Sequence, residues 1–303
     1  MKLYLKKNGM KTIFFKTIKK FYINKKLNFL LILFFVYIKF FDIKSNIVIL
    51  SKIYIKKIDK KVSHIPILVF HMLVPDDVKR SRFLKNEWIG SIDVFNQIIE
   101  WLYVNNYKTI NTEDFYYWYK GKTEYDPKTV LITFDDGYYD VYYLVYPILK
   151  KYNFKATCFI IGSKIKKKTP KYDKNKSGYI GEDVIDKIRK EYPNLEFQSH
   201  SYNMHYSTKI CIPRIKCMND NELEIDILEN SKYGFTTFSH PYGVFNNKIQ
   251  MLLKKKGYLC AFRLGPSDYA TRNSVQYAIP RIKINGLVNK NYAIKWIQNG
   301  NLN

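Results

Sequence analysis

The segment Val130-Leu-Ile-Thr-Phe-Asp-Asp-Gly137 is a short apolar run that ends in two adjacent carboxylates. The run predicts a buried strand, and Gly137 predicts a turn directly after it. Two carboxylates at such a place repel each other unless a cation or a shared proton relieves them. One of them can hold a metal ion while its neighbour accepts a proton from the metal's water. On its own, however, Asp-Asp-Gly is more often a solvated turn.

Outward from this segment, short apolar runs alternate with amphipathic stretches from Ile65 onward. Strands are predicted over 66–71, 130–134, 156–161, 195–198, 235–238, 258–262 and 281–284. Helices are predicted behind an N-cap at Ser91 and over 142–150, 182–190, 222–229 and 248–256. Strand–helix alternation of this length predicts a parallel α/β fold, either a barrel or an open sheet.

Three further polar groups stand where predicted strands end, the edge at which parallel α/β folds place their sites. Ser199-His200-Ser201-Tyr202-Asn203-Met204-His205 holds two of the five histidines. Two imidazoles and one carboxylate are a common ligand set for catalytic Zn²⁺, although a pair of histidines alone is a weak signal. Pro241-Tyr242-Gly243 is either an ordinary turn or a rigid loop that aims a backbone N–H at an oxyanion. His71 closes the strand at 66–71 and is by itself more typical of a structural histidine.

In this order, the three motifs resemble the polysaccharide deacetylase family, also called the NodB-homology domain or carbohydrate esterase family 4. The match to Thr133-Phe-Asp-Asp-Gly137 is complete, and Pro241-Tyr-Gly243 matches the third motif. His200 to His205 resembles the family's His-Ser/Thr-x-x-His motif with one extra residue, the form typical of the branch that acts on poly-N-acetylglucosamine. The resemblance covers roughly residues 64–286 and implies a distorted (β/α)7 barrel for a catalytic domain over 64–303.

The resemblance also implies roles for individual residues. Asp136, His200 and His205 would hold a divalent metal, usually Zn²⁺, and Asp135 would be the general base. The Tyr242 backbone N–H, set by Pro241 and Gly243, would stabilise the oxyanion. The implied activity is hydrolysis of the acetamide of N-acetylated sugars with release of acetate.

The chain departs from the family pattern at two places. Ser239 stands where the family has an arginine, and Arg281 resembles a Pro-Arg element of the poly-N-acetylglucosamine branch that would steady Asp135 instead. No C-terminal Leu-x-His supplies the general acid. In that branch the equivalent histidine comes from the first strand, which here is His71, with His240 as the alternative.

The N-terminal part of the chain predicts a membrane tether. Residues 1–26 are lysine-rich and contain no acidic residue, 27–41 form an apolar run interrupted by Lys39, and 42–63 are again rich in lysine. The run is short for a spanning helix, but it fits a signal-anchor or a signal peptide. A retained anchor would leave the catalytic domain outside the cytoplasm, whereas cleavage would give a secreted protein. The alternative for 27–41 is a buried or interfacial helix.

The net charge of +25 does not by itself predict a nucleic-acid partner. Only 7 of the 51 basic residues are arginine, the residue that nucleic-acid readers favour. Residues 1–60 carry a net charge of +13, which points to the membrane surface instead.

The family resemblance implies that the partner is an acetylated polysaccharide. Peptidoglycan or a lipid-linked sugar is an alternative substrate, and a non-catalytic carbohydrate-binding relative is an alternative class. Of the four cysteines, Cys211 and Cys217 are close enough to form a loop disulfide, although free thiols are favoured for all four.

Overall fold

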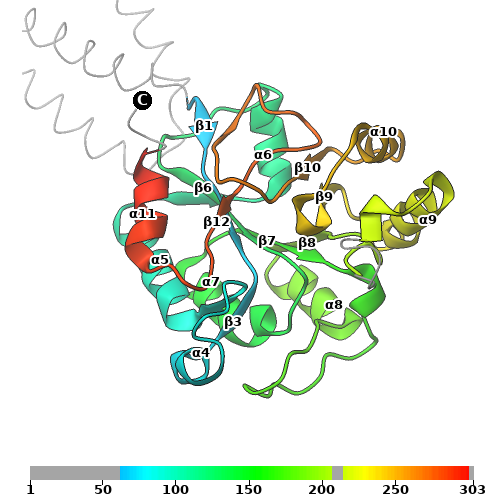
Figure 1. The fold of residues 1–303 in the computed structure, drawn as a ribbon. Coiled ribbons are helices and arrows are strands. Elements are labelled where there is room, and N and C mark those ends of the chain that lie inside the picture. Colours follow the sequence, from blue (N-terminus) through cyan, green and yellow to red (C-terminus); the bar gives the residue numbers. More distant parts are fainter. Residues whose placement is uncertain (1–61, 207–213, 300–303) are drawn as a thin grey trace, which may run out of the picture. The chain divides into compact units, whose positions relative to one another are not determined.

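A computed structural model describes residues 62–206 and 214–299 of the chain (Figure 1). The predicted anchor at 27–41 and nearly all of the predicted tether at 42–63 lie outside these residues. In the two described ranges, no helix has both the length and the apolar character needed to cross a membrane.

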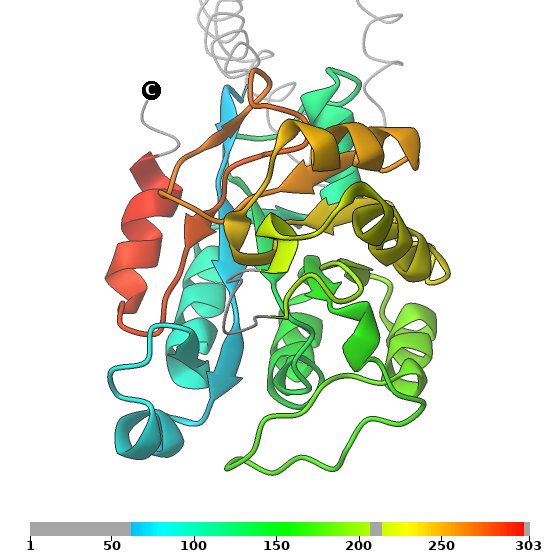
Figure 2. The same ribbon diagram turned by 45° about the vertical axis from the view of Figure 1, so that its right-hand side comes forward.

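The centre of the fold is a curled parallel sheet (Figures 1 and 2). Its strands follow the order β10-β9-β8-β7-β6-β2-β12, and every neighbouring pair along this path is parallel. They are β2 (Ile67–Phe70), β6 (Thr129–Phe134), β7 (Ala156–Ile160), β8 (Leu195–Ser199), β9 (Thr237–Ser239), β10 (Cys260–Phe262) and β12 (Ile282–Lys283). The two ends of the sheet approach each other, because Phe262 of β10 forms a parallel bridge with Ile279, just before β12. The predicted α/β barrel-like architecture is thus confirmed.

The remaining strands are short: β5 belongs to the central sheet, and the other four form two separate two-stranded sheets. β5 (Lys108–Ile110) pairs with the first half of β6, β1 (His64–Ile65) pairs antiparallel with β11 (Ala270–Thr271), and β3 (Met72–Val74) pairs with β4 (Ile89–Ser91). The helices are α4 (Asp76–Arg82), α5 (Ile92–Val104), α6 (Thr112–Tyr119), α7 (Tyr146–Tyr152), α8 (Glu182–Glu191), α9 (Asp220–Ser231), α10 (Asn247–Lys255) and α11 (Lys290–Asn299).

Side-chain alternation along the strands creates two separate apolar layers. Leu68 and Ile132 belong to the larger cluster, which includes the buried faces of the surrounding helices α5, α7 and α8. Ile67 and Leu131, one residue earlier on the same strands, belong to a second cluster with Phe115 of α6. Because successive strand residues point to opposite faces, the second cluster fills the inside of the curl. Along β6, the side chains on this inner face change from apolar Leu131 to polar Thr133 and then Asp135, which follows the strand.

Local sequence signals explain where several helices begin. The Ser91 side chain accepts hydrogen bonds from Asp93 N and Val94 N, so it caps α5 as the sequence predicted. The predicted helix at 142–150 instead begins as a π-helical turn, Val141–Val145, and only then continues as α7. Pro147 lies where the π-helical turn passes into α7.

The cysteines differ in state. Cys158 and Cys260 are free thiols buried in β7 and β10. Cys217 is disulfide-bonded, so the preference for a free thiol at this position was wrong. Cys211 lies outside the described residues.

Candidate active site

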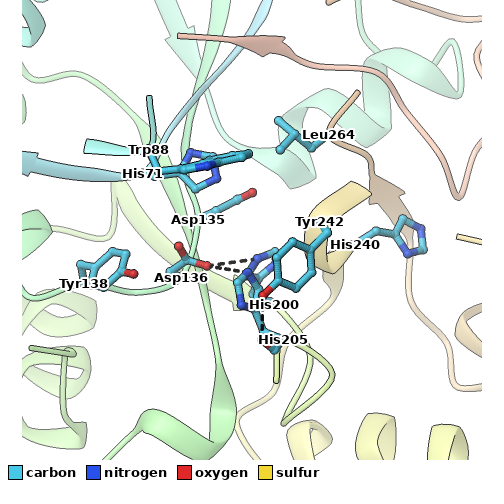
Figure 3. A pocket seen from close by; sticks show the side chains of 10 residues that line it. All are labelled: His71, Trp88, Asp135, Asp136, Tyr138, His200, His205, His240, Tyr242 and Leu264. Atoms are coloured by element: carbon cyan, nitrogen blue, oxygen red, sulfur yellow. Dashed lines mark hydrogen bonds and ion pairs between the residues drawn. The ribbon is translucent and has the colours of Figure 1, made fainter. Parts of the chain in front are cut away.

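A pocket opens at the carboxyl ends of the central strands (Figure 3). Because all strands of the curled sheet run parallel, the residues that follow them meet at one rim. The pocket is lined by His71, Trp88, Asp135, Asp136, Tyr138, His200, His205, His240, Tyr242 and Leu264. Every segment that the sequence singled out for chemistry therefore contributes to one site.

The turn after β6 separates the two adjacent carboxylates. Asp136 has φ 75° and Gly137 has φ 76°, so two successive residues adopt the left-handed region. A Cβ on Gly137 would lie 2.8 Å from Ile160 Cγ2 and 3.2 Å from its Cα, so the turn also requires glycine for space. As a result, the Asp135 side chain meets Arg281 and the Asp136 side chain meets two histidines.

Asp136, His200 and His205 form a group that can hold a metal ion. Asp136 Oδ1 lies 3.4 Å from His200 Nε2 and 3.1 Å from His205 Nε2, and one ligand atom from each residue lies within 4.8 Å of the others. Asp136 and His200 are buried, whereas His205 borders the pocket. One carboxylate oxygen and two imidazole nitrogens fit the donor set of a catalytic zinc site with open positions.

The surroundings of the two histidines prepare them as ligands. His200 Nδ1 lies 2.8 Å from the Ser239 carbonyl oxygen, so this nitrogen is a donor, and in the neutral imidazole Nε2 offers its lone pair to a metal. The His205 ring stacks on Tyr242 at a centroid distance of 4.4 Å. Burial and the neighbouring His200 lower the pKa of His205 to about 4, which leaves this imidazole neutral near pH 7.

Asp135 is clamped by Arg281. Arg281 Nη1 donates to Asp135 Oδ1 at 2.8 Å and Nη2 donates to Oδ2 at 2.6 Å, and both side chains are buried. Arg281 Nη2 also donates to Ser239 Oγ at 2.8 Å. Burial alone would raise the pKa of Asp135, but the charge of Arg281, the nearby His200 and the hydrogen bonds from Arg281 together hold that pKa far below its usual range. Arg281 thus contacts Asp135 directly, and Ser239 joins the same cluster.

The two histidines considered as proton donors differ in orientation. The His71 ring packs edge-to-face on Trp88 at a centroid distance of 4.9 Å, on the same side as Asp135 (Figure 3). Burial lowers the pKa of His71, and the charges of Asp136 and Asp135 oppose that effect. The His240 ring points away from the carboxylates, and its Nε2 lies 2.8 Å from the Tyr277 carbonyl oxygen (Figure 3). His71 is therefore better placed to reach a substrate in the pocket.

Pro241–Gly243 form a tight 3-10 turn at the rim. Tyr242 has φ 56°, which is unusual for a residue with a side chain, and Gly243 has φ 71°. A Cβ on Gly243 would lie 1.9 Å from the Leu264 carbonyl oxygen. The Tyr242 hydroxyl donates to the His205 carbonyl oxygen at 3.2 Å, which ties this turn to the second histidine.

Sequence reasoning missed Trp88, Tyr138 and Leu264 as pocket residues. Tyr138 follows the Asp-Asp-Gly turn directly and could have been found from that position. Trp88 lies before β4 and Leu264 after β10, and neither belongs to a motif or a periodic pattern.

Comparisons with known proteins find similar sequences and folds. A family model described as polysaccharide deacetylase matches residues 122–261. A poly-beta-1,6-N-acetyl-D-glucosamine N-deacetylase of Staphylococcus aureus is 29% identical over 221 residues, which cover 67% of this chain and 70% of the relative. Two solved structures share the fold. A Streptococcus pyogenes deacetylase in complex with acetate has a TM-score of 0.64 at 19% identity and covers 77% of this chain and 98% of its own. A de-N-acetylase from Aggregatibacter actinomycetemcomitans has a TM-score of 0.60 at 19% identity, and the match covers 78% of this chain and 99% of the de-N-acetylase chain.

Proposed function

We propose that this chain, which belongs to the polysaccharide deacetylase family, is a metal-dependent hydrolase that removes acetyl groups from a polysaccharide containing N-acetylglucosamine. The observation that carries the proposal is one pocket in which an Asp–His–His group lies beside a second carboxylate clamped by Arg281. A binding module has no need of this combination. The clamp would hold a proton acceptor next to a metal's water, which is what amide hydrolysis requires.

The residues divide the chemistry among them. Asp136, His200 and His205 would hold the metal, for which Zn²⁺ suits the donor set best. When bound, such a metal acidifies a water molecule and polarises the acetamide carbonyl. Arg281 keeps Asp135 ionised, so that this carboxylate can accept the proton that the attacking water loses.

The remaining steps concern the oxyanion and the leaving group. Water adds to the acetamide carbonyl carbon, the bond from that carbon to nitrogen breaks, and the products are acetate and the amine of the sugar. The Tyr242 backbone N–H would stabilise the oxyanion. An amine departs poorly unless it is protonated, and His71 is the group we assign to that proton.

The proposed substrate follows from the relatives and from the shape of the rim. The Staphylococcus aureus relative is named for poly-beta-1,6-N-acetyl-D-glucosamine, and we propose the same class of substrate here. Trp88 and Tyr242 are 41% and 42% exposed at the pocket, so each presents an aromatic side chain to an incoming sugar ring. We also propose that residues 27–41 anchor the protein in a membrane with the catalytic domain on the outer side.

The test is acetate release by the purified full chain from a panel of acetylated glycans, including poly-N-acetylglucosamine and peptidoglycan. We expect release from poly-N-acetylglucosamine that stops after chelation and returns with Zn²⁺. His200→Ala should abolish both activity and stoichiometric metal binding. His64→Ala, a histidine on β1 away from the pocket, is the matched control and should keep both. Full activity in a metal-free sample, or no acetate from any glycan, would contradict the proposal.

A further inference from the structure

The geometry points to Asp226 of α9 as a positioning residue for the metal site: its carboxylate fixes the loop that separates His200 from His205. This inference rests on the proposed function, because it concerns the same site. Asp226 is only 4% exposed. Its Oδ1 accepts a hydrogen bond from Tyr202 N at 2.7 Å, and its Oδ2 accepts one from Asn203 N at 2.7 Å.

The loop depends on such an acceptor because of its path. His200 follows β8 directly, and His205 must turn back so that its Nε2 reaches the same Asp136 oxygen. Ser201 starts the reversal with φ 65°, and its Oγ accepts a hydrogen bond from Met204 N at 3.1 Å. The next two backbone N–H groups, those of Tyr202 and Asn203, point toward α9. A single carboxylate that accepts from both is a charge-assisted arrangement, stronger than two neutral hydrogen bonds.

The two ends of the loop are held from other directions. On the side of β7, Gly162 N donates to Ser201 O at 3.0 Å and Ser163 N donates to Tyr202 O at 2.9 Å. On the opposite side, Tyr242 holds His205 by ring stacking and by its hydroxyl. Asp226 supplies the middle contact, at the residues that set the spacing between the two imidazoles.

Helix α9 does not need Asp226 for its own packing. Leu223 and Ile227 are 1% exposed and belong to the main apolar cluster, and Asn230 Nδ2 donates to Ser199 Oγ at 2.7 Å. Within residues 62–206 and 214–299, no lysine, arginine or histidine nitrogen forms an ion pair with Asp226. Both carboxylate oxygens instead accept hydrogen bonds from the loop. Burying a carboxylate costs free energy, and here the hydrogen bonds that offset this cost all fix the loop.

Asp226→Asn is the sharpest perturbation, because it keeps the shape of the side chain. An amide has one acceptor oxygen, so its NH₂ group would face one of the two backbone N–H groups. We expect the Kd for Zn²⁺, measured by competition with a chromophoric chelator, to rise by up to about 10- to 100-fold, the range for groups that orient metal ligands. The visible absorption spectrum of the Co²⁺-loaded protein should change as well, because the position of one imidazole changes.

Two control variants on the same helix separate positioning from stability and from charge. Ile227→Val removes buried apolar contact and lowers stability, and Glu229→Gln removes one carboxylate charge on the exposed face. Both should keep the Zn²⁺ affinity and the Co²⁺ spectrum of the unmodified protein. The melting temperature of each metal-free variant, measured in parallel, shows how much stability was lost.

The outcomes distinguish this inference from the proposed function. If the unmodified chain binds neither Zn²⁺ nor Co²⁺, the proposed function fails and Asp226 has no metal site to position. If the unmodified chain binds both but Asp226→Asn keeps its affinity and spectrum, only the inference about Asp226 is overturned. Equal losses of affinity in Asp226→Asn and in an equally destabilised Ile227→Val would also overturn it, because the role would then be stability alone.

Discussion

Replacing Arg281 by Met tests whether Arg281 holds Asp135 ionised in the floor of the pocket. Met approaches arginine in length but donates no hydrogen bond. The change removes the bonds of 2.8 and 2.6 Å to Asp135 and the bond of 2.8 Å to Ser239 Oγ. Because the exposed fraction is 0% for the Arg281 side chain and 2% for Asp135, water cannot replace the lost partner. Breaking a buried pair in this way costs about 3–5 kcal/mol of unfolding free energy.

The stability lost on Arg281→Met should depend on pH. In the unmodified chain the pKa of Asp135 is held below its unfolded value, so the pair stabilises the protein above about pH 4 and loses this effect only as pH falls below that value. Without Arg281, burial becomes the dominant influence and raises the pKa of Asp135 above its unfolded value. The folded variant then loses stability as pH rises. The penalty for Arg281→Met should therefore be smaller near pH 4 than near pH 7.

The assay is urea unfolding of both proteins at several pH values in metal-free buffer. Arg80→Met is the matched control, because the pair that Arg80 forms with Asp76 is exposed and should contribute at most about 1 kcal/mol. Adding Asp135→Asn to Arg281→Met should recover part of the loss, since it removes the unpaired charge. A penalty below about 1 kcal/mol, or one that does not change with pH, would refute the reasoning about this pair.

Three further predictions concern the acid, a buried carboxylate and the N-terminal segment. His71→Asn should lower kcat by about 10²- to 10⁴-fold and leave the metal content intact. If His71→Asn instead keeps normal turnover while His240→Asn loses it, His240 is the general acid. Burial raises the pKa of Asp140 to about 7 against the opposing hydrogen bond from Leu73 N, so this group lowers stability as pH rises from about 4 to 7. As pH rises over that range, the free energy of unfolding of Asp140→Asn, measured in urea, should therefore increase by up to about 4 kcal/mol relative to that of the unmodified chain. A difference in unfolding free energy between the two proteins that does not change with pH would contradict this. If 27–41 is a retained anchor, the protein should stay with membranes in high salt, whereas a soluble form beginning near residue 43 would show cleavage.

The chemistry-bearing turns were predictable because their signals are local. Leu131 to Gly137 contains a buried strand and a turn, and parallel strands necessarily bring their carboxyl ends together. The prediction that Asp136, His200 and His205 share one site needed only that rule and the family resemblance. By contrast, α6 was missed although Asn111 and Asp114 form a capping box, because its stripe of aromatic residues gives a weak helical pattern.

The sequence by itself determined which residue types stand at the ends of the strands, and therefore the class of chemistry. The tertiary structure decided which of them meet. Arg281 reaches Asp135 across 146 residues because β12 pairs with β2, and β2 pairs with β6, the strand that Asp135 follows. The choice between His71 and His240 likewise depends on the direction of each ring, which the packing against Trp88 and the contact with Tyr277 set. Such contacts depend on strand order and on the closure of the sheet, which arise from the packing of the whole domain and leave no mark in a short stretch of sequence.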